Sequence, residues 1–124
     1  MILLREYGLL FLKTVKTAGT SLEIALSASA DSADIVTPIS PVDELVRIKE
    51  GYQLPVNSGV SQDAERRYIH YVEENRDRLT YEDTYPHGPL EFYNHIDRIS
   101  ASERLDSEEL SKTKTVALVR HPSL

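Results

Sequence analysis

The chain has 124 residues, of which 40% are hydrophobic and 27% are charged, and it contains no cysteine. These values predict one globular domain over residues 1–124 with a modest core, and they exclude disulfides and thiolate metal sites. The formal net charge of −6 argues against broad binding to nucleic acid or to anionic membranes, and no apolar run is long enough to span a bilayer. We therefore expect a soluble, cytoplasmic protein.

The first predicted elements are a strand and a helix joined by a short polar turn. The apolar run 9–12 predicts a buried strand at 8–13, and a helix is expected at 19–29. The face of this helix expected to pack on the sheet is made by Leu22, Ala25 and Leu26. A strand, a tight turn and a helix aim backbone N–H groups and the positive helix end at one place, which suits an anion, usually a phosphate.

Five further elements and a loop are expected along the chain. Ile35 and Val36 predict a short strand, and Ser40 and Pro41 predict the start of a helix that ends near Gly51.

The second half of the chain carries weaker signals. Residues 64–79 predict a surface helix, whereas the prolines and glycine of 81–89 predict a loop. Residues 102–111 predict a short acidic helix, and 115–119 predict a second buried strand. The helically spaced residues of the surface helix are Tyr68, Tyr71, Val72 and Asn75.

Two apolar strands separated by helical segments favour a parallel sheet with right-handed crossovers. The expected fold is therefore α/β, with three layers and a P-loop-like parallel sheet flanked by helices. Ligands of such sheets gather at the carboxyl ends of the strands. Both the turn around Lys16 and the residue Arg120 follow such strand ends, which predicts a common anion site.

The turn differs from the loop of nucleoside triphosphatases, in which the lysine follows the last glycine. Here Lys16 precedes Gly19 by three residues, beside the backbone N–H groups of 18–21. A simpler interpretation is also open. Residues 20–23 (Thr-Ser-Leu-Glu) form a capping-box pattern that only starts a helix, with Lys13 and Lys16 as solvated surface charges.

Three stretches resemble motifs of one enzyme family. Residues 11–23 read Phe-Leu-Lys-Thr-Val-Lys-Thr-Ala-Gly-Thr-Ser-Leu-Glu. This string closely resembles the 5′-phosphosulfate-binding loop of sulfotransferases. It is most similar to the branch of heparan sulfate 2-O-sulfotransferases and bacterial relatives, whose loop reads Pro-Lys-Thr-Ala/Gly-Gly-Thr-Ser; Val15 replaces the proline. Residues 92–96 (Phe-Tyr-Asn-His-Ile) resemble the segment of the histidine base, and 119–122 (Val-Arg-His-Pro) resemble the start of the 3′-phosphate motif.

The resemblance implies transfer of a sulfuryl group from 3′-phosphoadenosine 5′-phosphosulfate (PAPS) to a hydroxyl or amine acceptor. It implies two catalytic residues, Lys16 to neutralise the leaving 5′-phosphate and His95 to take the acceptor proton. The implied cofactor-binding residues are Lys16, Thr17, Ala18, Gly19, Thr20, Ser21 and Arg120. His95 could equally be an ordinary hydrogen-bonded residue, and His87 and His70 are weaker candidates for the base. We expect no metal site, because no His/Asp/Glu cluster has ligand spacing.

The family motif around Arg120 continues into a helix, whereas this sequence stops at Leu124. The chain is therefore expected to be the N-terminal part of a sulfotransferase-like domain with an incomplete sheet, and an exposed sheet edge would permit a homo-oligomer. A second hypothesis is a non-catalytic truncated remnant or interaction module that keeps the anion loop, and a third is a nucleotide kinase-like enzyme.

Acidic pairs such as 43–44, 73–74 and 108–109 are expected on solvated helix faces. Their charge would repel a highly sulfated acceptor, which favours a small molecule or a less charged glycan as partner.

Overall fold

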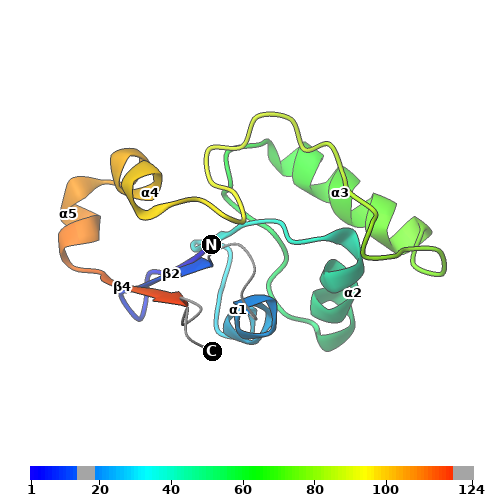
Figure 1. The fold of residues 1–124 in the computed structure, drawn as a ribbon, viewed down its shortest axis with the longest axis horizontal. Coiled ribbons are helices and arrows are strands. Elements are labelled where there is room, and N and C mark those ends of the chain that lie inside the picture. The colour runs from blue at the N-terminus through cyan, green and yellow to red at the C-terminus, as the bar shows by residue number, and fades with distance from the viewer. Residues whose placement is uncertain (14–18, 119–124) are drawn as a thin grey trace, which may run out of the picture.

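The computed structural model describes residues 1–13 and 19–118 (Figure 1). In this part of the chain the fold is α/β, with a four-stranded open sheet and five helices. The strands are β1 (Ile2–Leu4), β2 (Leu9–Lys13), β3 (Ile35–Val36) and β4 (Lys114–Leu118). The helices are α1 (Gly19–Ser27), α2 (Pro41–Glu50), α3 (Gln62–Glu74), α4 (Arg98–Arg104) and α5 (Ser107–Ser111).

The sheet is mixed, with strand order β3-β1-β2-β4. The two strands predicted from apolar runs, β2 and β4, are parallel neighbours, which confirms that part of the prediction. The expectation of a wholly parallel sheet is wrong, because β1 pairs antiparallel with both β2 and β3. Only the turn at 5–8 joins β1 to β2, and so short a connection can link antiparallel strands but not parallel ones.

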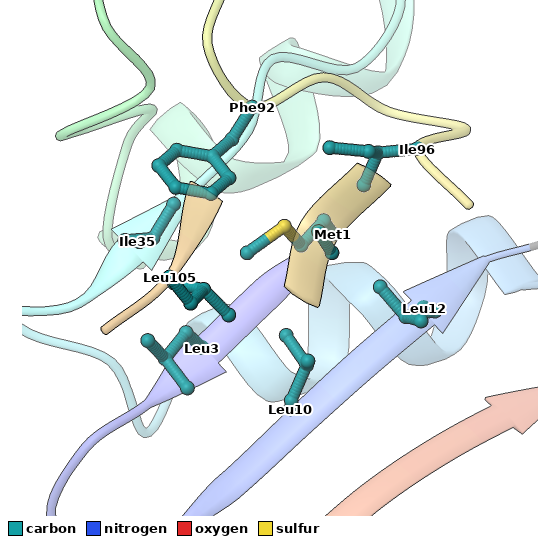
Figure 2. Close-up of a cluster of buried hydrophobic side chains, with 9 residues drawn as sticks. Met1, Leu3, Leu10, Leu12, Ile35, Phe92, Ile96 and Leu105 are labelled. Carbon is teal, nitrogen blue, oxygen red and sulfur yellow. The ribbon is translucent and has the colours of Figure 1, made fainter. Parts of the chain in front are cut away.

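Both faces of β1 and β2 are covered, whereas the prediction that β4 is buried is wrong, because its residues 114–117 are partly buried or exposed. On one face Leu3, Leu10 and Leu12 pack against the segment from Phe92 to Leu105, which includes α4 (Figure 2). On the other face Ile2, Leu4, Phe11 and Val36 form a second cluster, against which Leu26 of α1 packs. Alternate residues of β1 and β2 therefore serve opposite faces, as expected of a strand buried on both sides.

Helix α1 lies where it was predicted, but its buried face is different. Its buried residues are Gly19, Glu23 and Ser27. Leu22 is 38% exposed and Ala25 is exposed, so the predicted apolar face is wrong for these two residues, whereas Leu26 is partly buried. The reason is electrostatic, because Glu23 and Ser27 face cationic side chains from β2 and α2.

Helices α2 and α3 agree with the prediction in position. Helix α2 runs from Pro41 to Glu50 and is capped by Gly51, whose φ of 71° is the left-handed conformation that favours glycine. Helix α3 starts two residues earlier than expected and stops at Glu74, and it buries Tyr68 and Val72.

The single helix predicted over 102–111 is wrong, because the structure has α4 and α5 there. Leu105 is extended, and the Asp106 side chain accepts a hydrogen bond from the Glu109 N–H to start α5. The predicted loop at 81–89 has no helix or strand. In the described ranges no helix is long and apolar enough to cross a membrane.

Candidate functional site

The structure describes four of the predicted site residues. Gly19, Thr20 and Ser21 form the first turn of α1, and His95 lies in a turn just before α4. The remaining predicted residues, Lys16, Thr17, Ala18 and Arg120, lie outside the described residues.

The ends of β2 and β4 lie side by side, because Lys13 pairs with Leu118 in the parallel register. Residues 14–18 follow Lys13 in the chain and lead to α1, while Arg120 comes two residues after Leu118. In sequence, the two predicted phosphate-binding segments therefore follow the carboxyl ends of two neighbouring parallel strands. Ligand sites of parallel strands lie at these carboxyl ends.

His95 lies near the carboxyl end of β2. Phe92 and Ile96 are buried in the core on either side of it, and the Ile96 N–H donates to the Tyr93 carbonyl over 3.2 Å to close the turn. Nδ1 of His95 lies 3.4 Å from the carbonyl oxygen of Lys13, the last residue of β2. A carbonyl can only accept, so Nδ1 is the donor in this contact and the neutral ring has its lone pair on Nε2.

Lys13, the last residue of β2, is buried. It is not a solvated charge, because its side chain is only 4% exposed. Its Nζ donates to Oγ1 of Thr20 over 3.0 Å and lies 2.9 Å from Oε2 of Glu23. Lys13 thus connects the end of β2 with the first turns of α1, across the two ends of segment 14–18.

A buried network of charges continues from Glu23 into α2. Oε1 of Glu23 lies 3.1 Å from the α-amino group of Met1 and 4.0 Å from Nη2 of Arg47. Nη1 of Arg47 lies 2.8 Å from Oε1 of Glu44, and both side chains are fully buried. Nε of Arg47 donates to Oγ of Ser27 over 2.9 Å. The network therefore fixes α1 and α2 to each other and to Met1, which directly precedes β1.

The expectation that Glu44 lies on a solvated helix face is wrong. Burial raises its pKa above the usual range, and the neighbouring Arg47 opposes that rise. A signal for the network was present in the spacing of Glu44 and Arg47, three residues apart on one side of a helix. Their partner Glu23 is not near in sequence, so periodicity gives no hint of it.

Two grooves open near the carboxyl end of β2. A groove of about 650 Å³ is lined by Thr20, Ser21, Ile24, Asp43, Val46 and Tyr81. A second, of about 410 Å³, has His95 in its wall together with Tyr85, Tyr93, Leu90 and Asp83. Tyr81 lines both grooves, and its side chain is 79% exposed. The site thus has one opening over the first turn of α1 and another beside His95.

The other two candidates for the base lie in different surroundings. The ring of His87 meets Tyr68 edge-on at a centroid distance of 4.4 Å, and burial lowers the pKa of His87. His70 is 73% exposed on α3, where its Nε2 lies 2.9 Å from Glu74. Of the three histidines, His95 is the one in contact with the end of β2.

Over residues 1–13 and 19–118, no group of three or more His, Asp or Glu side chains is placed to hold a metal ion. The arrangement instead combines hydroxyls and N–H groups at a helix start with an imidazole, which suits anion binding and proton transfer. Comparison of the chain with models of protein families, with curated proteins and with solved structures finds no match.

Proposed function

We propose that this chain carries the donor-binding loop and the base of a PAPS-dependent sulfotransferase, which moves a sulfuryl group to a hydroxyl or amine acceptor. The observation that supports the proposal best is the contact between His95 and the Lys13 carbonyl, because 82 positions separate these residues in sequence. The loop motif and the base motif resemble the family independently. Their meeting at one strand end is what a shared site requires.

The described residues suit the 5′-phosphosulfate of the donor. Thr20 and Ser21 line the groove at the start of α1, and the backbone N–H groups of a first helical turn have no partner within the helix. Thr20 and Ser21 would hold phosphate oxygens together with Lys16, and Arg120 would bind the 3′-phosphate in bidentate fashion.

The reaction divides into roles for these residues. PAPS supplies an activated sulfuryl group whose S–O bond to the 5′-phosphate breaks as the acceptor oxygen or nitrogen bonds to sulfur. Nε2 of His95 accepts the acceptor proton, and Lys16 neutralises the negative charge that develops on the phosphate. Positioning and charge stabilisation supply most of the rate in such in-line transfers.

The groove beside His95 is where we place the acceptor. Its aromatic and aliphatic side chains, with the carboxylate of Asp83 in the wall, suit a small acceptor without strong negative charge. A heavily sulfated glycan would meet repulsion from Asp83 in this groove.

Calorimetric titration with adenosine 3′,5′-bisphosphate tests the donor site. The chain should bind this product, and Lys16→Ala and Arg120→Ala should abolish the heat. Lys112→Ala is the matched control, because that side chain is 75% exposed and lies 3.5 Å from Glu108 on the surface. Absence of binding by the unaltered chain would contradict the proposal, and a preference for ATP would favour a kinase-like enzyme.

Transfer assays with labelled PAPS and a panel of hydroxyl and amine acceptors test the base. His95→Ala should remove turnover and leave bisphosphate binding intact, whereas His70→Ala should change neither. Binding without transfer to any acceptor would instead favour the non-catalytic module.

A further inference from the structure

We propose that Lys13 is a positioning residue that aligns the base and the phosphate-binding hydroxyl from opposite ends of one residue. Its main-chain carbonyl orients His95, and its ammonium group orients Thr20. The inference rests on the proposed function and assigns Lys13 a role that neither the motif resemblance nor the general chemistry of the loop supplies.

The carbonyl acts on the base. Its oxygen lies 3.4 Å from Nδ1 of His95 and holds the proton of the neutral ring on that nitrogen. Nε2 is then left as the proton acceptor, and the ring is anchored to the strand that leads into the loop. Orientation of a catalytic imidazole through its other nitrogen is a general requirement of such bases.

The ammonium group of Lys13 orients the hydroxyl of Thr20. Nζ donates to Oγ1 of Thr20 over 3.0 Å, so one lone pair of the hydroxyl is occupied and its proton is directed away from Lys13. Thr20 also lines the groove at the start of α1. The hydroxyl proton is thereby available to an anion in that groove.

Glu23 holds the ammonium in place. Its carboxylate lies 2.9 Å from Nζ and is itself fully buried, so the pair is shielded from water. An unpaired charge at such a depth is strongly unfavourable, which keeps Lys13 on Glu23 and Thr20 rather than extended toward solvent. Lys13 therefore acts through Thr20, and not as a direct ligand of the donor phosphate.

A double-mutant cycle on donor binding separates this role from a general structural one. Lys13→Met and Thr20→Val should each weaken binding of adenosine 3′,5′-bisphosphate about tenfold, as expected for a charge-assisted hydrogen bond. The double variant should bind no more weakly than Thr20→Val alone, and Thr20→Ser, which keeps the hydroxyl, should bind more tightly than Thr20→Val. Lys49→Met, on the exposed side of α2, is the control and should have no effect.

Additive losses in the cycle, or full affinity in Lys13→Met, would overturn the inference while leaving the proposed function standing. If Lys13→Met does not fold, Lys13→Met combined with Glu23→Gln removes both charges of the pair and carries the same cycle. No binding by the unaltered chain would instead refute the proposed function, and the present inference with it.

The imidazole provides a readout that needs no donor. ¹⁵N spectra of the neutral His95 ring should show a protonated Nδ1 and an unprotonated Nε2, in the unaltered chain and in Lys13→Met, because the carbonyl is present in both. The opposite tautomer would overturn the proposed role of the carbonyl.

Discussion

The hydroxyl of Tyr68 on α3 lies 3.1 Å from Oε2 of Glu44 on α2. The same carboxylate forms the buried ion pair with Arg47. The hydroxyl also lies 2.6 Å from the carbonyl oxygen of Ile39, just before α2. Burial and the neighbouring carboxylate both raise the pKa of Tyr68 above its ordinary value, so the hydroxyl keeps its proton and remains a donor. Tyr68 thus links the outer helix to the buried charges behind the candidate site.

Tyr68→Phe should lower the free energy of unfolding by about 1–3 kcal/mol, because it removes a buried hydroxyl that contacts the Ile39 carbonyl, while Oε2 of Glu44 keeps the Ile39 N–H as a donor. Urea unfolding measures the change. Tyr81→Phe removes a hydroxyl from a side chain that is 79% exposed, and it should alter stability by less than about 0.5 kcal/mol. Equal effects of the two variants would contradict the importance of the Tyr68 contacts.

Arg47→Met should be more damaging, with a loss of about 3–5 kcal/mol, because Glu44 and Glu23 would remain buried with less positive charge beside them. Adding Glu44→Gln to Arg47→Met should recover part of the loss. Arg76→Met, at an exposed position after α3, is the control for the chemistry of the substitution. A double variant that is as unstable as the sum of its single variants would refute the coupling.

His87 should make stability depend on pH. Burial lowers its pKa from the ordinary value of 6.5, so the folded state favours the neutral ring. The stabilisation is complete above pH 6.5 and is lost as the pH falls through the lower pKa of the folded state, because the unfolded chain takes up the proton first. Thermal unfolding at a series of pH values should show a smaller acid-induced decrease in Tm for His87→Phe, which keeps the ring against Tyr68.

His70→Phe, at a position that is 73% exposed, is the control for replacing a histidine by phenylalanine. An identical decrease in Tm for His87→Phe and the unaltered chain would assign the pH dependence to other groups.

Gly59 should tolerate substitution less well than Gly51, although both have positive φ values, of 105° and 71°. A Cβ on Gly59 would lie 2.6 Å from Cβ of Glu91, whereas one on Gly51 would meet nothing within 4 Å. We expect Gly51→Ala to cost about 1–2 kcal/mol through the left-handed backbone alone, and Gly59→Ala to cost more.

The Gly59 effect should extend to the site. The N–H groups of Glu91 and Phe92 both donate to the Ser58 carbonyl, so the segment that leads to His95 is anchored beside Gly59. In transfer assays Gly59→Ala should therefore lower turnover, and Gly51→Ala should not.

Elements bounded by proline and glycine, or formed by a continuous apolar run, could be predicted from the sequence. Pro41 and Gly51 mark both ends of α2, and the apolar runs gave β2 and β4 to within one residue. The strand β1 was missed because Ile2–Leu4 is too short to show a period, and its partners determine it.

The site was predictable only in part, for a related reason. The order of the motifs indicated His95 as a candidate base. A lysine and a glutamate, by contrast, are expected at the surface unless their partners are known. Lys13 and Glu23 are buried because each compensates the other's charge, and the hydrophobic pattern of α1 carries no trace of that pairing.

The position of β4 has a consequence for the order in which the protein folds. Strands β1 and β2 close over a four-residue turn, whereas β2 must pair Leu9 with Lys114. Contacts so distant in sequence form slowly, so pulse-labelling hydrogen exchange should find β1 amides protected before those of β4. During synthesis, β4 can pair with β2 only after the ribosome has released residue 118. The candidate site therefore assembles long after the first hairpin can form.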